Sequence, residues 1–530
     1  MSGREWWRGG VFYQIYPRSY KDTNKDGIGD LKGITEKLDY VASLGVDAIW
    51  ISPFFKSPMK DYGYDVSDYC AIDPLFGTLD DFRILLDKAH RLNIKVIVDI
   101  VMSHTSEDHK WFKESASSRD NPKADWYVWA DPKKDGTPPN NWLSLFGGSA
   151  WQFNVFRGQY YLHNFLKEQP DLNYHNPDVV QAMLEQCRFW LDLGVDGFRL
   201  DAVNFCTHDK YLRDNPPRDD GGMATQLEFP DAYAMQWHRY DKSQPENLDL
   251  MRKIRQLLDQ YPGTMALAEI GDDDFVRVAA AYTASADMLH TAYSFGLMAN
   301  KGGVPPAMMF QSRIEDQKAQ PGESWPAWAI SNHDVVRAAS RWSGTDYGHD
   351  PRLSKMLVAL VASLRGTPFL YQGDELGLPE ADIPYERILD PWGKYLYPKW
   401  KGRDGSRTPM PWEDKPLAGF TKAKDSWLPV PEAHRALSVA RQDKDQNSTL
   451  NFTRYFLHWR KTRPALIDGE INFIESGRAD VLLFERTGQG ETILCAFNLS
   501  KNDVSVNGMD LDSYEARFSN GDQVLFSSVL

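Results

Sequence analysis

Short apolar segments rich in β-branched and aromatic residues alternate along this chain with longer amphipathic segments. Most apolar segments precede a stretch with helical periodicity, as at 78–93 and 247–262, and Thr78, Asn176 and Asn247 are expected to cap helices. Parallel strands need such crossover connections, so the alternation predicts a parallel sheet. Eight strands favour an α/β fold of the closed (β/α)8 TIM barrel type over a doubly wound sheet. The eight segments are 11–17, 46–53, 94–102, 195–203, 264–271, 288–295, 325–332 and 368–377.

The strand–helix alternation is interrupted twice and gives way to a different pattern near the end of the sequence, and these changes define the predicted domains. The Trp-, Asn-, Pro- and Gly-rich stretch after the third strand is too long for a bare loop and predicts an inserted subdomain over the barrel mouth. The short alternating strands near the end predict a C-terminal β-sandwich. The predicted parts are the first part of the barrel (1–101), the inserted subdomain (102–175), the second part of the barrel with a loop-rich excursion at 378–446 (176–463), and the sandwich (464–530).

The net charge and the cysteine content indicate which binding partners and which cellular compartment to expect. The formal net charge of −14 argues against nucleic acid or an anionic membrane as partner and is compatible with a neutral ligand. Four scattered cysteines, without a CxxC pair, favour a reducing compartment, so we expect a cytoplasmic protein. The apolar run 356–364 is about half the length of a membrane span, and no signal peptide is visible. The oligomeric state is left open.

Ionisable residues end several of the apolar strands, where a barrel of this type carries its chemistry. Charged groups on apolar strands are costly to bury unless they pair or act. Several acids converging on one mouth suit cleavage of a glycosidic bond, which needs one carboxylate at the anomeric carbon and another at the leaving oxygen. A salt-bridge layer inside the barrel is the structural alternative. The residues are Asp99, Arg199, Asp201, Glu269, His333 and Asp334.

Seven ordered motifs resemble the α-amylase clan of glycoside hydrolases (family thirteen), most closely its bacterial exo-α-glucosidase and oligo-1,6-glucosidase branch. The motifs are QIYPRSY, GYDVSDY, DIVMSHT, GFRLDAVNF, AEIGD, SNHDVVR and RTPMPW, and the resemblance covers nearly the whole chain. It implies that Asp201 is the nucleophile, Glu269 the general acid and base, and Asp334 the stabiliser of the transition state. Arg199 stands two residues before Asp201 on a strand, so both point to one side and the guanidinium can keep Asp201 ionised.

The same resemblance implies the substrate-binding residues. Tyr64, His104, His333 and Phe165 are expected to contact the glucose that is released. Asp61 and Arg403 correspond to an acid and a base that close the site around the non-reducing end, although a surface pair between Arg403 and Asp404 is an alternative. Ala202 follows the nucleophile, where Ala or Thr tends to accompany α-1,4 preference and Val α-1,6 preference.

An oxygen-rich loop near the N-terminus suits a hard divalent cation. Asp22, Asn24, Asp26 and Asp30 are evenly spaced, but the twelfth position is not Glu, so an EF-hand is not expected. In the resembling family this loop binds a structural ion, with the carbonyl of Ile28 contributing, which implies Ca²⁺ or Mg²⁺ here. A metal-free turn held by side-chain hydrogen bonds is the alternative.

The sequence therefore predicts a retaining exo-α-glucosidase that acts on small oligosaccharides or glucosides, prefers α-1,4 (maltose-type) linkages and can transfer glucose to an alcohol. No organic cofactor is expected. The alternatives are an oligo-1,6-glucosidase, or a sucrose- or trehalose-acting glucosyltransferase. A non-catalytic scaffold on the same barrel would be expected to lack the carboxylates and to carry a membrane anchor, and this sequence shows neither feature.

Overall fold

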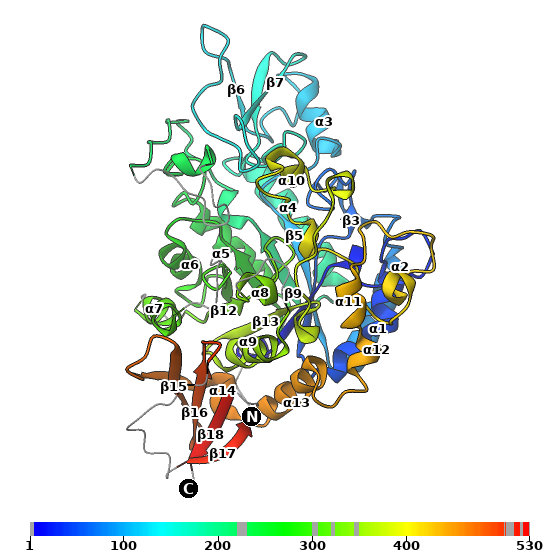
Figure 1. Ribbon diagram of the computed structural model, residues 1–530. Coiled ribbons are helices and arrows are strands. Elements are labelled where there is room, and N and C mark those ends of the chain that lie inside the picture. Colours follow the sequence, from blue (N-terminus) through cyan, green and yellow to red (C-terminus); the bar gives the residue numbers. More distant parts are fainter. Residues whose placement is uncertain are drawn as a thin grey trace.

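A barrel at the centre of the molecule separates a small lobe at one end from an antiparallel sheet at the other (Figure 1). The computed structural model describes residues 5–219, 231–298, 306–319, 324–343, 349–502, 504, 514–519 and 523–528. Among these residues, none of the helices combines the length and apolar character needed to cross a lipid bilayer.

Eight parallel strands close the barrel, and each overlaps one of the eight predicted segments, so the predicted fold class is confirmed. Closure joins the beginning of the chain to residues far along it, with Phe12 opposite Phe369. The strands, in sequence order, are β1 (Phe12–Ile15), β2 (Ala48–Ile51), β5 (Lys95–Val101), β9 (Gly197–Asp201), β10 (Met265–Glu269), β11 (Thr291–Ser294), β12 (Ala327–Ala329) and β13 (Thr367–Tyr371).

Aromatic side chains fill the barrel interior. The rings of Phe12 and Phe369 stack with centroids 4.5 Å apart, and Trp50 meets Tyr293 edge to face at 5.7 Å. All four side chains are buried. The interior is therefore a packed core that supports the strand ends rather than a pore.

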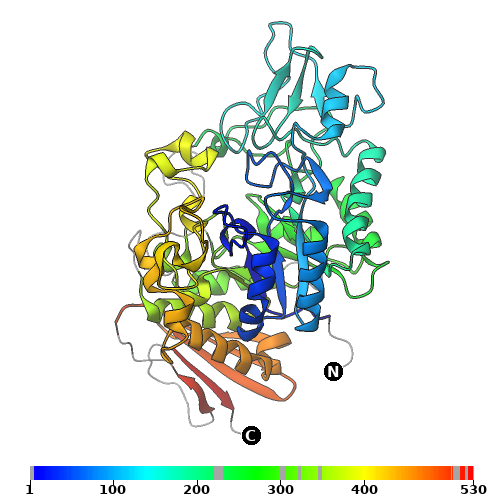
Figure 2. The same ribbon diagram turned by 90° about the vertical axis from the view of Figure 1, so that its right-hand side faces the viewer.

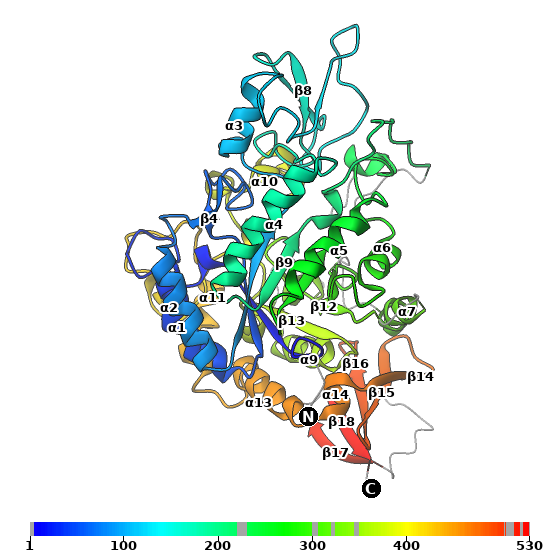
Figure 3. The ribbon, with the colours of Figure 1, turned by 180° about the vertical axis from the view of Figure 1, so that it is seen from behind.

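Helices surround the barrel (Figures 2 and 3). Thr78 caps α2 in a capping box with Asp81, and Asn176 caps α4, as the sequence predicts. Asn247 was expected to be a cap but is the first residue of α5, and its side chain instead donates to the carbonyl of Val203 at 2.9 Å. The helices around the barrel are α1 (Leu31–Ser43), α2 (Leu79–Arg91), α4 (Pro177–Asp192), α5 (Asn247–Leu258), α6 (Phe275–Thr283), α7 (Ala307–Lys318), α8 (Ala338–Arg341), α9 (Pro351–Ser363) and α13 (Thr449–Lys461).

Two small sheets stand outside the barrel. Between β5 and α4, the chain forms α3 (Lys110–Ser117) and an antiparallel sheet of β6 (Trp129–Ala130), β8 (Gln159–Leu162) and β7 (Trp151–Asn154). These elements form the lobe at the top of Figure 1. After β2, β3 (Phe55–Lys56) pairs with β4 (Asp68–Ile72). After β13, the loop-rich segment contains only short helices, among them α10 (Pro391–Leu396), α11 (Glu432–Ala436) and α12 (Val439–Gln442).

The chain ends in an antiparallel sheet, which in the described residues is a single layer of five strands in the order β14-β15-β16-β18-β17. Helix α14 (Pro464–Asp468) packs against β15 and β16, and α9 also contacts β16, so helices cover this sheet where a second sheet was expected. The strands are β14 (Glu470–Ile474), β15 (Val481–Gly488), β16 (Glu491–Asn498), β17 (Tyr514–Ser519) and β18 (Gln523–Ser528).

Candidate active site

Three neighbouring strands bring acidic side chains together at their carboxyl ends. Strand β9 lies between β5 and β10 and carries Arg199 and, as its last residue, Asp201. Asp99 on β5 is in register with Arg199, and Glu269 ends β10. Because Arg199 and Asp201 alternate on one strand, both face the same side. The sheet register therefore places one arginine among three acids.

The guanidinium of Arg199 contacts all three carboxylates. Its Nη1 lies 2.9 Å from Oδ1 of Asp99 and also contacts Oδ1 of Asp201, while Nη2 contacts Oε1 of Glu269. The arginine side chain is only 1% exposed. One positive charge cannot balance three buried negative charges, so this cluster favours keeping a proton on one of its carboxyl groups.

The pKa values identify where that proton is held. Burial raises the pKa of Glu269 to about 8, and the charges of Asp201 and Asp334 add to the effect against the opposing charge of Arg199. Burial raises the pKa of Asp201 to about 7, with Arg199 opposing and Asp99 adding. Of the two groups, Glu269 therefore holds a proton more strongly than Asp201. This order suits a proton-donating Glu269 beside an ionised Asp201.

The backbone after Asp201 also holds Glu269. Ala202 has φ 42°, in the left-handed region that non-glycine residues rarely adopt. In this conformation its N–H donates to Oε2 of Glu269 at 3.0 Å. Both oxygens of Glu269 are thus held by β9 and the residue that follows it.

Asp334 lies across the site, in the loop after β12, and two arginines bind it. Its Oδ1 is 2.8 Å from Nη2 of Arg407 and 3.3 Å from Nη1 of Arg403. Burial alone raises the pKa of Asp334, but His333, Arg403 and Arg407 outweigh burial and lower it well below its usual range. Asp334 is therefore ionised at neutral pH, unlike Glu269.

Tyr64 and His333 form a flat wall beside these acids. Their rings are stacked, with an interplanar angle of 4° and centroids 5.4 Å apart, and Tyr64 Oη lies 2.6 Å from His333 Nε2. Burial lowers the pKa of His333 to about 3, so the ring is neutral. Gln14 Nε2 donates to His333 Nδ1 at 2.7 Å, which leaves the ring proton on Nε2, facing Tyr64 and Asp334.

His104 and Phe165 stand on the side of the inserted subdomain. His104 Nε2 lies 3.0 Å from the carbonyl of Tyr64 and donates to it, and the His104 and Phe165 rings are 5.0 Å apart. Phe165 in turn contacts Phe205, which lies shortly after β9, with ring centroids 5.2 Å apart. These ring contacts hold the inserted subdomain against the segment that follows β9.

Arg403 joins acids from three separate parts of the chain. Its Nη2 lies 2.9 Å from Oδ1 of Asp61 and 2.8 Å from Oδ1 of Asp390, and Nη1 reaches Asp334. The neighbouring Asp404 is not its partner, because Asp404 accepts the backbone N–H groups of Leu389 and Asp390 instead. The cluster ties the loop after β2 to the segment after β13.

Sequence reasoning did not assign three of these residues. Asp99 was noted at a strand end without a role, Arg407 lies in the RTPMPW motif without an assigned contact, and Asp390 carries no local signal. Only the folded chain shows that Asp390 pairs with an arginine 13 residues away.

The oxygen-rich loop forms a tight turn held by its own side chains. Asp22 accepts the backbone N–H groups of Lys25 and Gly27, and Asp26 accepts that of Ile28. Asp30 accepts from Gly33 and caps α1. Within the described residues, no three His, Cys, Asp or Glu side chains are gathered closely enough to hold a metal ion by themselves.

Comparison with known proteins identifies relatives along nearly the whole chain. The family model described as alpha amylase, catalytic domain, matches residues 14–469. A probable alpha-glucosidase of Rhizobium meliloti (strain 1021) is 52% identical over 499 residues, which cover 94% of this chain and 90% of the relative. An oligo-1,6-glucosidase of Heyndrickxia coagulans is 37% identical over 545 residues, covering 96% and 94% respectively.

Solved structures agree with these relatives. The alpha-glucosyl transfer enzyme XgtA is 51% identical, with a TM-score of 0.94 and 99% of both chains covered. The trehalulose synthase MutB from Pseudomonas mesoacidophila MX-45 is 32% identical, with a TM-score of 0.87, covering 99% of this chain and 100% of that one.

Proposed function

Because the chain belongs to the α-amylase family of glycoside hydrolases, we propose that it is a retaining, exo-acting α-glucosidase that releases glucose from short α-glucosides. The observation that carries the proposal is the contact of one buried guanidinium, that of Arg199, with both Asp201 and Glu269. Retaining enzymes keep their two carboxyl groups close together, whereas inverting enzymes leave room for a water between them. Asp201 and Glu269, held by the two terminal nitrogens of one arginine, lie close together as a retaining mechanism requires.

In the first step, Asp201 attacks the anomeric carbon while Glu269 gives its proton to the leaving oxygen. The bond between that carbon and the leaving oxygen breaks, and a β-glycosyl ester forms on Asp201. Burial of Glu269 supplies the proton at neutral pH. Asp334, which stays ionised, is placed to accept hydrogen bonds from substrate hydroxyls and to stabilise positive charge on the sugar ring.

In the second step, the ionised Glu269 takes a proton from a water molecule, which attacks the anomeric carbon and releases Asp201. The N–H of Ala202 and the guanidinium of Arg199 stabilise this ionised form of Glu269. Two inversions give net retention, so glucose leaves as the α-anomer. An alcohol that replaces the water would receive the glucosyl group, which makes transglucosylation part of the proposal.

The ion pairs of Arg403 with Asp61, Asp390 and Asp334 support the exo mode. These side chains link two loops across one side of the site, and Arg403 is only 7% exposed. A buried cluster of this kind closes the site beyond the glucose ring, so a chain could not extend through it. Hydroxyls of a terminal glucose can bind to the charged groups of the cluster.

Initial-rate product analysis tests the reaction. Proton NMR of the first glucose released should show the α-anomer before mutarotation, and initial β-glucose would contradict retention. Asp201→Asn should abolish release, and near-normal turnover would reject the nucleophile.

The linkage preference is the finer part of the proposal. Ala202 beside the nucleophile leaves room that we associate with α-1,4 substrates, so maltose should be cleaved faster than isomaltose. Because some relatives are named oligo-1,6-glucosidase and trehalulose synthase, α-1,6 hydrolysis and sucrose conversion are the alternative activities for this chain. Product analysis on maltose, isomaltose, sucrose and trehalose separates these activities, and faster hydrolysis of isomaltose would overturn the α-1,4 preference.

A structural divalent cation in the loop 22–30 is a further part of the proposal. The donors are hard oxygens, which suit Ca²⁺ or Mg²⁺. Each carboxylate has about four lone-pair positions, so the hydrogen bonds within the turn leave some of them for an ion. The carboxylates of Asp22, Asp26 and Asp30 are not gathered around one point in the described residues, so they would have to converge on the ion together with the amide oxygen of Asn24 and the carbonyl of Ile28.

We also propose that the protein works in the cytoplasm. All four cysteines are free thiols, and three of them are buried. Thiols of this kind are compatible with a reducing compartment. Immunodetection after cell fractionation tests this, and recovery of the protein outside the cytoplasm would contradict it.

A further inference from the structure

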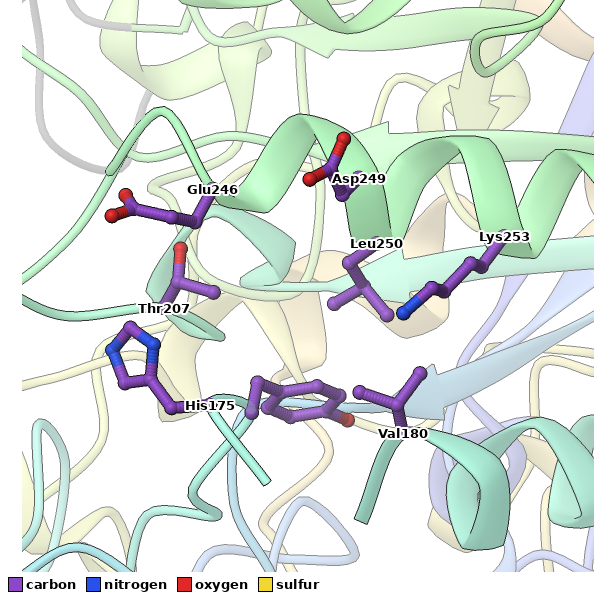
Figure 4. A pocket seen from close by; sticks show the side chains of 8 residues that line it. His175, Val180, Thr207, Glu246, Asp249, Leu250 and Lys253 are labelled. Atoms are coloured by element: carbon purple, nitrogen blue, oxygen red, sulfur yellow. The ribbon is translucent and has the colours of Figure 1, made fainter. Parts of the chain in front are cut away.

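A second pocket lies between the starts of α4 and α5, behind the loop that leaves the nucleophile strand. Its volume is about 200 Å³, smaller than the roughly 300–1,000 Å³ of pockets that hold drug-sized ligands. Figure 4 shows side chains that line it from the two helices and the loop. The lining residues are Tyr174, His175, Val180, Thr207, Glu246, Asp249, Leu250 and Lys253. None of them belongs to the catalytic site described above.

Thr207 supplies a hydroxyl without a partner. The residue is 3% exposed, and its Oγ1 has no hydrogen-bond partner among the described residues. In Figure 4 this oxygen is directed toward the side on which Glu246 lies. A buried hydroxyl left without a hydrogen bond costs free energy, so the position favours a ligand that supplies one.

The charged side chains around the pocket favour a neutral ligand over an anion or a metal cation. Glu246 and Asp249, whose Oδ1 is also paired with Arg252 Nη1 at 2.9 Å, disfavour an anion. The ammonium of Lys253, which points toward Leu250, disfavours a metal cation (Figure 4). Glu246 is the residue before α5 but makes no capping hydrogen bond, so its carboxylate is available to accept one from a ligand. Hydroxyl groups can satisfy carboxylates and an ammonium at the same time, because they both donate and accept.

His175 adds an acceptor, and the floor is apolar. His175 Nε2 donates to the carbonyl of His208 at 2.8 Å, which leaves Nδ1 as the ring nitrogen that can bind a ligand hydroxyl. Tyr174, Val180 and Leu250 supply apolar surface. Acceptors and donors around an apolar floor match the C–H face and hydroxyl rim of a sugar ring.

From this geometry we propose that the pocket is a second binding site for a neutral, monosaccharide-sized polyol, with D-glucose as the fitting probe. The site is independent of the catalytic proposal, since it shares no residue with it. A bound sugar would connect Thr207 with the first turn of α5. The side chain of Asn247 in that turn holds the carbonyl of Val203, two residues after Asp201, so binding would stabilise the loop behind the nucleophile.

Glucose titrations of the full-length protein, followed by saturation-transfer NMR, test the site with three variants. Asp201→Asn prevents turnover and serves as the background. On it, Thr207→Val removes the hydroxyl at nearly constant volume, and Thr207→Ser keeps it. We expect Thr207→Val to weaken one class of glucose sites by about 3- to 10-fold, the effect of one hydrogen bond, and Thr207→Ser to restore it. The unfolding temperatures of the variants check that all are folded.

Crystals of the Asp201→Asn protein soaked with glucose locate the site directly. Glucose between His175, Thr207 and Lys253 is the expected result. An empty pocket at saturating glucose, or identical glucose affinities in the Thr207→Val and Thr207→Ser proteins, would overturn the proposal. In the protein with Asp201 intact, the Thr207→Val substitution alone should leave kcat/KM on an aryl α-glucoside unchanged in the absence of added glucose, because Thr207 lies outside the catalytic cluster.

Discussion

Arg199 and Asp99 form a buried ion pair, with Nη1 of Arg199 2.9 Å from Oδ1 of Asp99 and neither side chain more than 1% exposed. Asp99 Oδ2 also accepts hydrogen bonds from Trp50 Nε1 at 3.1 Å and Tyr64 Oη at 3.2 Å. Asp99 is thus a second negatively charged partner of Arg199, beside Asp201, and its charge raises the pKa of Asp201. In the proposed mechanism, Asp99 is therefore expected to position Arg199 and to influence the ionisation of Asp201.

Asp99→Asn should move the acidic limb of the kcat/KM profile to lower pH. Removing this charge lowers the pKa of Asp201, so more of the nucleophile is ionised at a given acidic pH. Rates measured from pH 4 to 9 check the shift. The matched control is Asp196→Asn, which removes a carboxylate bound by Lys95 at the other end of the same strand and should leave the profile in place. An unchanged acidic limb in Asp99→Asn would contradict the assignment.

The pH profile of the unmodified enzyme should be bell-shaped. Activity rises as Asp201 ionises near its pKa of about 7 and falls as Glu269 loses its proton near its pKa of about 8. Maximal kcat/KM is therefore expected between these values.

The Glu269→Gln substitution tests which group produces the alkaline limb of the pH profile. On an unactivated glucoside its kcat should fall by about 10²- to 10⁴-fold, the usual contribution of a general acid. With a dinitrophenyl glucoside, whose leaving group needs no proton, formation of the glycosyl-enzyme in single-turnover experiments should persist and lose the alkaline limb. Normal turnover of maltose by this variant would reject the acid role.

Arg403→Lys should weaken substrate binding at the closed end. Lysine keeps the charge but cannot reach Asp61, Asp334 and Asp390 together, because it lacks the planar fork of arginine. Loss of one charge-assisted hydrogen bond predicts a fall in kcat/KM on maltose of roughly 10- to 100-fold, mainly through KM. Arg387→Lys, in the same segment but paired with the exposed Asp425, is the control and should change little. Equal effects of the two substitutions would argue against a closed end at Arg403.

Thr78→Ala should destabilise the start of α2. The substitution removes the side chain that accepts from Asp81 N–H, a loss of about 1 kcal/mol for an N-cap. Hydrogen exchange should become faster in the first turn of α2, with little change in kcat. Thr137→Ala, in an exposed loop of the inserted lobe, is the control. Unaltered exchange in α2 would show that the cap adds nothing there.

Removal of divalent cations should lower the unfolding temperature, and Ca²⁺ or Mg²⁺ should restore it. The loop 22–30 contacts the segment after β13, because Thr421 Oγ1 binds Asp22. An ion in this loop would therefore stabilise both segments. Elemental analysis should find about one ion per chain, and Asp26→Ala should abolish it. An ion retained by this variant would place the site elsewhere.

The barrel could be predicted from the sequence because its signal is local. Each strand is a short apolar run, and each run is buried in the structure over most of its length, as at β9 and β13. The same pattern is absent from β3 and β6, which are two residues long and form only where other segments meet them. The cap expected at Asn247 was wrong because Val203, a tertiary partner, uses that side chain.

The acids of the candidate site could be found for a related reason, since strand ends are visible in sequence and point to one mouth. Their pairing shows no local signal in the sequence, and the joint role of Asp61 and Arg403 was indicated only by the resemblance to the α-amylase clan. Asp390 and Asp61 meet Arg403 across loops of no regular pattern, and the contact of Arg403 with Asp61 spans 342 positions. Such contacts depend on the closure of the barrel and not on local periodicity.

The pairing of β1 with β13 has a consequence for synthesis of the chain. Residues 12–14 leave the ribosome early, yet their partners at 369–371 emerge more than 350 positions later. During that interval β1 has an unpaired edge, and the other barrel strands can form only an open sheet. Open edges of this kind favour association with other chains, and long-range pairing slows folding. Heterologous production should therefore improve when translation is slowed or when chaperones shield the nascent sheet until β13 arrives.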